Sequence, residues 1–302
     1  MAFVLTLICD PAHPAVDTGA VAAALEALRS QGVAASEPRW LADAIACDIP
    51  FRAPAASGLE DAARARLADR PVDVAVQPSE GRRRRMLVAD IESTMIANEM
   101  LDEIAALADS DGTLGRQVAD LTARAMRGEL DFREALRARV RLLRGRPAAL
   151  LERARERIMF TPGAAALVAT MRKHGAFTAL VTGGFEPFTQ WVRERLGCDV
   201  AIGNRLGIEN GVLTGAVAEP IVDRDGKRAA LTALAAERDI PLADVMAVGD
   251  GANDVPMVQA AGAGVAFRAK KILADAARFR VAHGDLTALL YLQGYTEREI
   301  VG

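Results

Sequence analysis

From residue 86 onward, short apolar runs alternate with segments of helical periodicity. The runs lie at residues 86–90 (MLVAD), 177–181 (FTALV), 245–248 (VMAV) and 264–267 (GVAF). Short, mostly apolar runs of this kind are typical of strands that are buried on both faces of a sheet. Because helical patterns separate the runs, the alternation predicts an α/β fold built on a doubly wound parallel sheet.

One long helical stretch interrupts this alternation after the first run. Between residues 98 and 157 apolar residues such as Leu101 and Ile104 recur at helical spacing, which predicts a helical insertion there. Residues 124–157 hold eleven arginines and five acidic residues, but Phe132 is the one aromatic side chain available to stack on a base. We therefore interpret these charges as a solvated helical face with intrahelical ion pairs, and we expect no nucleic-acid partner.

The first 80 residues follow a different pattern. Apolar runs at residues 3–9 and 72–76 indicate a first and a last strand, and two amphipathic segments and two further short apolar runs lie between them. The order β-α-β-β-α-β predicts a small ferredoxin-like module. Residues 78–81 (PSEG) indicate a linker, so we expect two domains, residues 1–80 and 81–302.

Composition and charge exclude several classes of protein. The chain has 37 basic and 40 acidic residues, a net charge of -3, so no global field favours nucleic acid or a membrane surface. The longest uncharged run, residues 158–171, is shorter than the roughly 18 apolar residues that a spanning helix needs. Cys9, Cys47 and Cys198 are far apart, and no basic residue precedes Arg29, unlike in a signal peptide. We expect a reduced, cytoplasmic protein.

Polar residues follow three of the apolar runs, where parallel strands would end. Asp90 and Glu92 follow the first run, Thr182–Phe185 (TGGF) the second and Gly249–Asp254 (GDGAND) the third. Because the carboxyl ends of parallel strands meet at one edge of a sheet, we expect these residues to form one site. Lys227, at the start of a predicted helix, is a fourth candidate.

These residue types suit phosphoryl transfer. A carboxylate such as Asp90 can attack phosphorus, and a second one, such as Glu92, can move a proton. The hydroxyl and main-chain N–H groups of TGGF can hold phosphate oxygens, a lysine can neutralise them, and the oxygens of GDGAND suit Mg²⁺. Taken singly, Asp90 could cap a turn, TGGF could be an ordinary turn and Lys227 could be solvated. Four such motifs in order favour a single site.

DIEST (residues 90–94), TGGF, Lys227 and GDGAND together resemble the ordered motifs of the haloacid dehalogenase superfamily of phosphohydrolases. Within it, residues from about 84 to 295 resemble the phosphoserine phosphatases, because two stretches of the insertion match the helical cap of that family. These stretches are Asn98-Glu99 with Asp102–Ala105, and residues 125–140. The first 80 residues resemble the ACT-like domain of longer bacterial members. The resemblance implies a phosphatase core, residues 81–302, with a cap at about 98–157.

The resemblance also implies a role for each matching residue. Asp90 is expected to be the nucleophile that forms an aspartyl-phosphate, and Glu92 the acid and base. Mg²⁺ is expected between the Asp90 carboxylate, the Glu92 main-chain carbonyl and Asp250, with Asp254 nearby. The phosphoryl group of the substrate is expected to be held by four residues of the core: Thr182, Gly183, Lys227 and Asn253. In the cap, Glu99 is expected to pair with the substrate ammonium and Arg139 with the substrate carboxylate. Met126 and Phe132 are expected to exclude water. For Glu99 and Arg139 the alternative is ion pairing on a helix surface.

Two residues depart from the family pattern. Glu92 stands where the family usually has Asp, and Thr182 where it often has Ser. Threonine keeps the hydroxyl, whereas glutamate reaches one methylene further, so the geometry of proton transfer must differ. We expect Glu92 to remain the acid and base.

The resemblance implies Mg²⁺-dependent hydrolysis of O-phospho-L-serine to L-serine and phosphate, the last step of serine biosynthesis. One alternative is a phosphatase or phosphotransferase acting on another small phosphomonoester. Another is an amino-acid-sensing protein whose phosphatase site has decayed through Glu92. ACT-like domains often pair across subunits, so a homodimer through the N-terminal domain is a further hypothesis. No membrane partner is expected.

Overall fold

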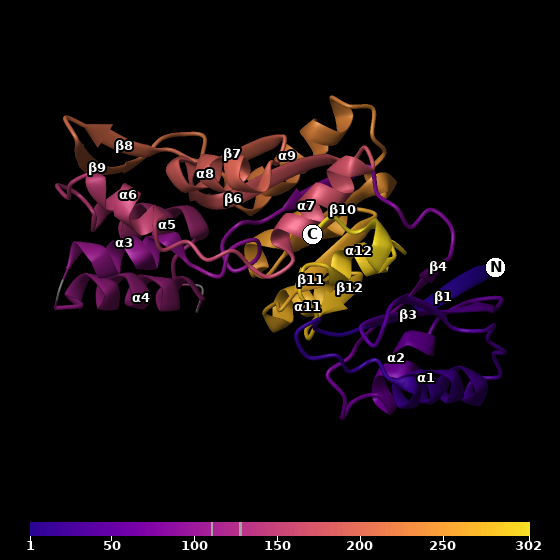
Figure 1. Ribbon diagram of the computed structural model, residues 1–302. Coiled ribbons are helices and arrows are strands. Elements are labelled where there is room, and N and C mark those ends of the chain that lie inside the picture. Colours follow the sequence, from indigo (N-terminus) through magenta and orange to yellow (C-terminus); the bar gives the residue numbers. More distant parts are fainter. Residues whose placement is uncertain (110, 127–128) are drawn as a thin grey trace.

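The computed structural model describes residues 1–109, 111–126 and 129–302. Its centre is a six-stranded sheet with the order β12-β11-β10-β5-β6-β7, in which neighbouring strands pair in parallel (Figure 1). We call it the core sheet. Its strands are β5 (Met86–Ala89), β6 (Phe177–Phe185), β7 (Val200–Asn204), β10 (Val245–Gly249), β11 (Ala263–Phe267) and β12 (Phe279–Val281). The expected parallel α/β sheet is confirmed.

The strand order of the core sheet reverses between β5 and β10. From β5 the chain adds β6 and β7 on one side, and then returns to add β10, β11 and β12 on the other. Ala89 at the end of β5 is paired with Val248 near the end of β10. Crevices that bind ligands in open α/β sheets lie outside the carboxyl ends of the strands at such a reversal.

Helices cover both faces of the core sheet because successive strand residues point to opposite sides. Met86 and Val88 belong to one apolar cluster, and Leu87 and Ala89 to the other. The first cluster includes α9 (Arg224–Ala236), α10 (Val255–Ala260) and α11 (Lys271–Ala276), and the second α7 (Ala164–Lys173), α8 (Glu186–Leu196) and α12 (Ala288–Leu292). In the described part of the chain, no helix is both long enough and apolar enough to span a bilayer.

Within the described residues, four helices lie between β5 and α7, and we call this part of the chain the helical insertion. They are α3 (Met100–Ala108), α4 (Thr113–Met126), α5 (Phe132–Arg141) and α6 (Ala149–Arg155). A hairpin that the sequence patterns did not predict, β8 (Leu206–Glu209) and β9 (Val212–Val217), lies against them (Figure 1). The N–H groups of Gly145 and Ala148 donate to the carbonyls of Leu213 and Gly211, each at 2.8 Å. The insertion is therefore held by a second segment as well as by its two connections.

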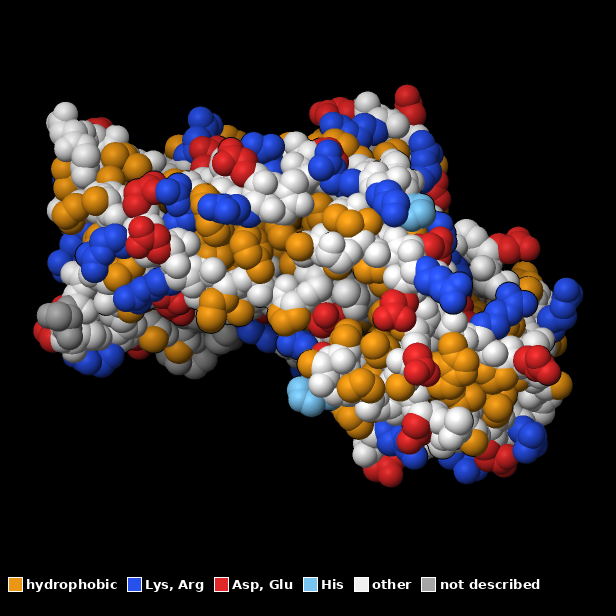
Figure 2. Space-filling view, in the orientation of Figure 1, with side chains coloured by type: hydrophobic (Ala, Val, Ile, Leu, Met, Phe, Trp, Pro, Cys, Tyr) orange, Lys and Arg blue, Asp and Glu red, His pale blue; other side chains and the backbone are white. Residues whose placement is uncertain are grey.

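The arginines of the helical insertion lie among acidic side chains on the surface (Figure 2). The expected intrahelical ion pairs account for only part of them. Arg155 pairs with Glu152 on α6, but Arg133 on α5 pairs with Asp223 of the core, with Nε 2.6 Å from Oδ2. Arg137 likewise pairs with Glu219. The expectation is corrected here, because two of these pairs join the insertion to the core.

Residues 2–78, which we call the N-terminal unit, contain a separate four-stranded antiparallel sheet and two helices. The strand order of this sheet is β2-β3-β1-β4. Leu5 and Leu7 face its two helices, whereas Ile8 and Ala75 join the apolar cluster that contains Leu289 of α12. Both faces of the sheet are thus covered. The elements are β1 (Ala2–Ile8), α1 (Thr18–Ser30), β2 (Arg39–Ala42), β3 (Ala46–Arg52), α2 (Leu59–Arg66) and β4 (Asp73–Pro78).

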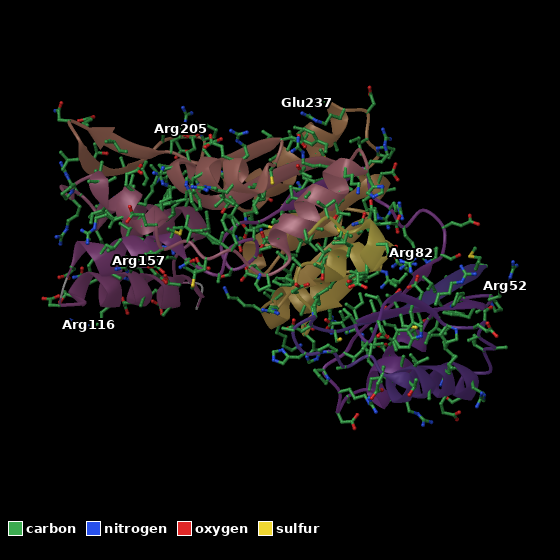
Figure 3. The ribbon with its side chains drawn as sticks, in the orientation of Figure 1. Arg52, Arg82, Arg116, Arg157, Arg205 and Glu237 are labelled. Atoms are coloured by element: carbon green, nitrogen blue, oxygen red, sulfur yellow. The ribbon has the colours of Figure 1, made fainter. Side chains whose placement is uncertain are left out.

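Arg82 lies at the junction of the N-terminal unit and the core (Figure 3). Its guanidinium donates to the Asp48 carboxylate at 2.5 and 3.2 Å and to the Thr6 hydroxyl at 3.2 Å, both in the N-terminal unit. It also donates to the carbonyls of Tyr291 and Leu292 in the last turn of α12, each at 3.0 Å. Asp48 is buried, so this one guanidinium satisfies groups from both parts of the chain.

We predict that Arg82→Met lowers the free energy of unfolding by about 3–5 kcal/mol, because it leaves the buried Asp48 carboxylate without a countercharge. Urea unfolding measures this change. Adding Asp48→Asn should recover part of the loss. Arg52→Met, at an exposed position on β3, is the matched control and should change stability by less than about 0.5 kcal/mol. Equal, small losses for Arg82→Met and Arg52→Met would contradict the role of Arg82.

Candidate active site

Asp90 is the first residue after β5, at the point where the strand order reverses. Its N–H donates to the Val248 carbonyl at 3.0 Å, and its side chain is buried. The chain then turns sharply: Ser93 has a φ of 54°, and the N–H groups of residues 94–96 all donate to the Ile91 carbonyl. This turn ends the strand at Asp90 and places its carboxylate at the edge of the core sheet.

Lys227 brings two of the expected carboxylates together. It lies in the first turn of α9, whose N-cap Asp223 accepts the N–H groups of Asp225 and Gly226. Its ammonium is buried, with Nζ 2.8 Å from Asp90 Oδ1 and 2.7 Å from Asp254 Oδ1. The two carboxylates outweigh burial and raise the pKa of Lys227, which favours its charged ammonium form. It is a buried ion-pair partner, and the solvated-lysine alternative is wrong.

The loop after β10 is folded around the Asp254 side chain. Asp254 Oδ2 accepts the N–H groups of Asp250 at 3.2 Å and Gly251 at 3.0 Å. A Cβ at residue 249 would lie 2.4 Å from the Asp254 carboxyl carbon, so this close approach requires glycine there. Lys270, which the sequence motifs did not include, donates its N–H to the Asp250 carbonyl at 2.9 Å, and its Nζ lies 3.7 Å from Asp250 Oδ2.

The donor set of the site fits a divalent cation. Asp90, Asp250 and Asp254 each offer a carboxylate oxygen, and these oxygens all lie within 4.8 Å of one another. Burial, together with the charge of Asp254, raises the pKa of Asp90 to about 7 and that of Asp250 to about 6. Crowded carboxylates with raised pKa values are destabilised as anions, and a hard cation such as Mg²⁺ would offset their repulsion.

Glu92 is half-buried beside this cluster. Its Oε1 accepts the N–H of Met100 at the start of α3, at 2.9 Å. Burial, reinforced by the charges of Glu99 and Asp90, raises the pKa of Glu92 to about 8. On the other side, a Cβ at Gly184 would lie 2.8 Å from Glu92 Oε2. The longer glutamate side chain therefore fits because residue 184 has no side chain.

Thr182–Phe185 lie inside β6, which corrects the expectation that this motif follows the strand. The pairing of β6 with β7 shifts between Val181 and Phe185, and Thr182 Oγ1 accepts the Gly184 N–H at 3.0 Å within this irregular stretch. The buried Asn204 at the end of β7 donates to the carbonyls of Gly183 at 2.8 Å and Val222 at 3.3 Å. Asn204 was missed, although it ends an apolar run as Asp90 does.

The helical insertion contributes two side chains near the site. The Phe132 ring of α5 lies against Gly183, because a Cβ there would be 3.0 Å from Phe132 Cζ. Arg139 on the same helix is half-buried and donates to Thr122 Oγ1 at 3.4 Å and to the Ala135 carbonyl at 3.3 Å. Among the described residues no carboxylate lies within 4.0 Å of its guanidinium. Burial lowers the pKa of Arg139.

Three of the remaining candidates differ in their surroundings. Glu99 is exposed, and its Oε1 accepts the Ser93 hydroxyl at 2.6 Å. Asn253 lies half-buried in the loop after β10. The side chain of Met126 lies outside the described residues.

Residues 87–259 match the family model of the haloacid dehalogenase-like hydrolases. This chain belongs to that family. Among curated proteins, the phosphoserine phosphatase of Streptomyces coelicolor is 43% identical over 231 residues, which are 76% of this chain and 55% of that protein. The match thus spans about half the length of that relative.

Two solved structures in the family resemble this fold. A HAD family hydrolase from Salmonella enterica subsp. enterica serovar Typhi aligns with a TM-score of 0.83 and 26% identity, over 97% of this chain and 98% of the other. A phospho-aspartyl intermediate analogue of phosphoserine phosphatase aligns with a TM-score of 0.64 and 37% identity, over 69% of this chain and 98% of the other. The first likeness extends over the N-terminal unit, and the second is limited to part of the chain.

We predict that Lys227→Met lowers the free energy of unfolding by about 3–5 kcal/mol in protein freed of divalent cations with EDTA, because two buried carboxylates lose their countercharge. Denaturant unfolding measures this, and adding Asp254→Asn should recover part of the loss. Lys270→Met is the matched control, since its ammonium is largely exposed. It should change stability by less than about 1 kcal/mol. A loss no larger than that of the control would show that Lys227 is not the central countercharge.

Proposed function

We propose that this chain is a cytoplasmic, Mg²⁺-dependent phosphatase that converts O-phospho-L-serine to L-serine and phosphate, the last step of serine biosynthesis. The observation that carries the proposal is the Asp90 carboxylate, which lies beside the buried Lys227 ammonium and within a cluster of three carboxylates at the reversal of strand order. The similarity to named phosphoserine phosphatases supports the substrate.

Asp90 and Glu92 divide the chemistry. A carboxylate oxygen of Asp90 attacks phosphorus, the bond from phosphorus to the serine oxygen breaks, and an aspartyl-phosphate forms. Glu92 has a pKa raised to about 8, so it is protonated at neutral pH and can give that proton to the leaving serine oxygen. The resulting Glu92 carboxylate then takes a proton from water, which attacks phosphorus and releases phosphate from Asp90.

Other residues hold the phosphoryl group and a cation. Bound Mg²⁺ would supply positive charge to the phosphoryl oxygens and keep Asp90 ionised. The proposed ligands are the carboxylates of Asp90 and Asp250 and the main-chain carbonyl of Glu92, with Asp254 alongside. Lys227 remains a countercharge to Asp90 in both steps. The Thr182 hydroxyl, the Gly183 N–H and the Asn253 amide are proposed to bind phosphoryl oxygens.

The helical insertion is proposed to be a cap that selects the substrate, with boundaries at residues 98–157. Arg139 supports this because its half-buried guanidinium keeps donors open that a substrate carboxylate can accept bidentately. Glu99 is proposed to pair with the substrate ammonium, and Phe132 and Met126 to exclude water. The ion pair between Arg133 and Asp223 would hold such a cap against the helix of Lys227.

We also propose that residues 1–80 form an ACT-like domain and residues 81–302 the phosphatase core. The element order β-α-β-β-α-β and the antiparallel strand order β2-β3-β1-β4 support a ferredoxin-like topology for the first of these. Pairing of two chains through this domain remains a hypothesis.

The substrate is tested with Arg139→Gln and a panel of phosphate esters. For the unmodified protein we expect the highest kcat/KM with O-phospho-L-serine, above phosphothreonine, phosphoethanolamine and phosphocholine, and loss of turnover in EDTA. Arg139→Gln should lower kcat/KM for phosphoserine by about 10- to 100-fold, since a hydrogen bond to a charged group contributes about 1.5–3 kcal/mol. Phosphoethanolamine has no carboxylate, so its kcat/KM should be unchanged.

Asp90→Asn is the control for contaminating phosphatases and should abolish turnover while the circular dichroism spectrum is unchanged. Retained turnover in Asp90→Asn would exclude the covalent mechanism. A higher kcat/KM with another ester would show that phosphoserine is not the substrate. An equal loss of kcat/KM for phosphoserine and phosphoethanolamine in Arg139→Gln would show that Arg139 does not bind the substrate carboxylate.

We predict that Gly184→Ala lowers kcat by about 10²-fold, because the added methyl group displaces the Glu92 carboxylate from the Met100 N–H. In that background Glu92→Asp shortens the side chain and should restore part of kcat. Steady-state kinetics measures both. Gly115→Ala in α4 is the control, because the new Cβ would have no described atom within 4 Å outside its chain neighbours and the backbone of its own helix. An unchanged kcat in Gly184→Ala would mean that the position of Glu92 does not limit turnover.

A further inference from the structure

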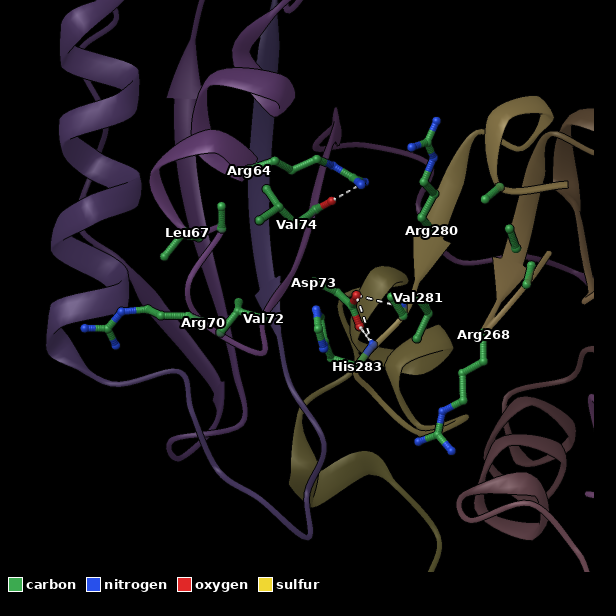
Figure 4. A pocket seen from close by; sticks show the side chains of 15 residues that line it. Arg64, Leu67, Arg70, Val72, Asp73, Val74, Arg268, Arg280, Val281 and His283 are labelled. Carbon is green, nitrogen blue, oxygen red and sulfur yellow. Dashed lines mark hydrogen bonds between the residues drawn. The ribbon is translucent and has the colours of Figure 1, made fainter. Parts of the chain in front are cut away.

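A cavity of about 640 Å³ lies between the N-terminal unit and the core, away from the carboxylate cluster (Figure 4). Leu67 and Val72 line it from the N-terminal unit, and Ala269, Ala274 and Val281 line it from the core. Its volume is within the range of about 300–1,000 Å³ that is usual for small-molecule sites, and such sites occur preferentially between domains.

Basic side chains outnumber acidic ones in the lining of this cavity, and each of the four arginines also lies within 4.0 Å of a carboxylate outside the lining. Its lining includes four arginines and a histidine but a single acid, Asp73. The Asp73 carboxylate is already used, because it accepts the N–H groups of Ala282 at 2.8 Å, His283 at 3.1 Å and Gly284 at 2.8 Å. In Figure 4, dashed lines join the Asp73 carboxylate to the backbone of the core wall. The acid in the lining therefore fixes the two walls together and forms no hydrogen bond to a guanidinium within the described residues.

Two of the four arginines, Arg268 and Arg280, keep hydrogen-bond donors open, whereas the other two are paired with carboxylates. Arg64 and Arg70 each have a carboxylate partner at 2.8 Å, Glu60 and Asp17 respectively. Arg268 donates to the Gly284 carbonyl at 3.2 Å through one Nη, and its carboxylate partner, Asp10, lies at 4.0 Å. The carboxylate partner of Arg280, Asp275, lies at 3.7 Å, so within the described residues neither guanidinium forms a hydrogen bond to a carboxylate.

Both of these side chains are accessible to a ligand. Their exposed fractions are 42% for Arg268 and 45% for Arg280. Guanidinium groups bind carboxylate and phosphate oxygens in a bidentate way, and the short apolar side chains between them suit a small carbon skeleton.

The wall that carries Arg268 also reaches the carboxylate cluster. Arg268 has a φ of 43°, and two residues later Lys270 donates its N–H to the Asp250 carbonyl and places Nζ 3.7 Å from Asp250 Oδ2. A ligand that moves residues 268–270 therefore shifts two contacts of Asp250. No other residue need change for the cavity and the cluster to be coupled.

We propose that this cavity binds a small metabolite that bears a carboxylate or phosphate group, through Arg268 and Arg280, and that binding changes cation affinity at Asp250 through residues 268–270. The binding site stands independently of the proposed function. The coupling rests on it, because it requires Mg²⁺ to bind at the carboxylate cluster.

Calorimetric titration of the full chain with sulfate and with succinate tests the site. We expect binding at concentrations up to a few tens of millimolar, weakened by added NaCl. Each of Arg268→Gln and Arg280→Gln should weaken it by about tenfold or more. Arg228→Gln, at an exposed position on α9, should leave it unchanged. Tighter binding of sulfate indicates a phosphate ester, and tighter binding of succinate a carboxylic acid.

Several outcomes overturn the site. Absence of binding by both probes would do so, as would equal affinity in Arg268→Gln, Arg280→Gln and the unmodified protein. Sulfate that also binds at the carboxylate cluster is recognised because Lys227→Met, not Arg268→Gln, removes that binding.

The coupling is measured by titrating Mg²⁺ with and without the saturating probe. We expect a change in Mg²⁺ affinity of about threefold or more, and by linkage the same factor in probe affinity when Mg²⁺ is saturating. Lys270→Met should reduce this factor toward one without changing probe binding in the absence of Mg²⁺. Equal Mg²⁺ affinities would exclude the coupling but keep the site. Absence of Mg²⁺ binding under either condition would contradict the proposed function instead.

Discussion

The buried ammonium of Lys227 is the interaction on which the candidate site depends. Asp90 ends β5, Asp254 closes the loop after β10, and both carboxylates are buried at hydrogen-bond distance from Nζ. A buried carboxylate without a countercharge is unstable, so α9 stabilises the meeting of the two strand ends by placing a cation between them. The N-cap of α9 by Asp223 therefore matters for the site as well as for the helix.

Asp223 also links the site to the helical insertion. Its Oδ1 caps α9, and its Oδ2 pairs with Arg133 of α5. From the same helix, Phe132 lies against Gly183, whose carbonyl is held by Asn204. Movement of the insertion away from the core would thus break contacts to both segments that frame the proposed phosphoryl position. The insertion and the site are thus linked through shared contacts at Asp223 and Gly183.

The sequence predicted most of the core and the motif residues because buried parallel strands leave short apolar runs with polar residues at their ends. Runs 86–90 and 245–248 correspond to β5 and β10, and the polar residues that follow them meet as expected. The segment from β7 to β9 was missed although residues 200–203 are apolar, because its strands are short and largely half-buried. The hairpin is held by hydrogen bonds to the insertion, which is far away in the sequence. Arg133 and Arg137 also pair with residues that are far away in the sequence, so a local pattern does not predict these contacts.

The polar residues of the N-terminal sheet show why its placement could not be deduced from its own pattern. Thr6 and Asp48 alternate with apolar residues on β1 and β3, as residues on a solvent-facing surface do. In the folded chain both are buried, because the Arg82 guanidinium donates hydrogen bonds to both side chains. The same guanidinium donates to the Tyr291 carbonyl in α12 and so joins the sheet to the core. A sheet that appears half-exposed is therefore covered on both faces, and Arg82, Gln77 and Asp73 fix its position on the core. These contacts fix the wall of the cavity that the N-terminal unit provides, so binding energy is not spent on ordering that wall and remains available to move residues 268–270 on the other side.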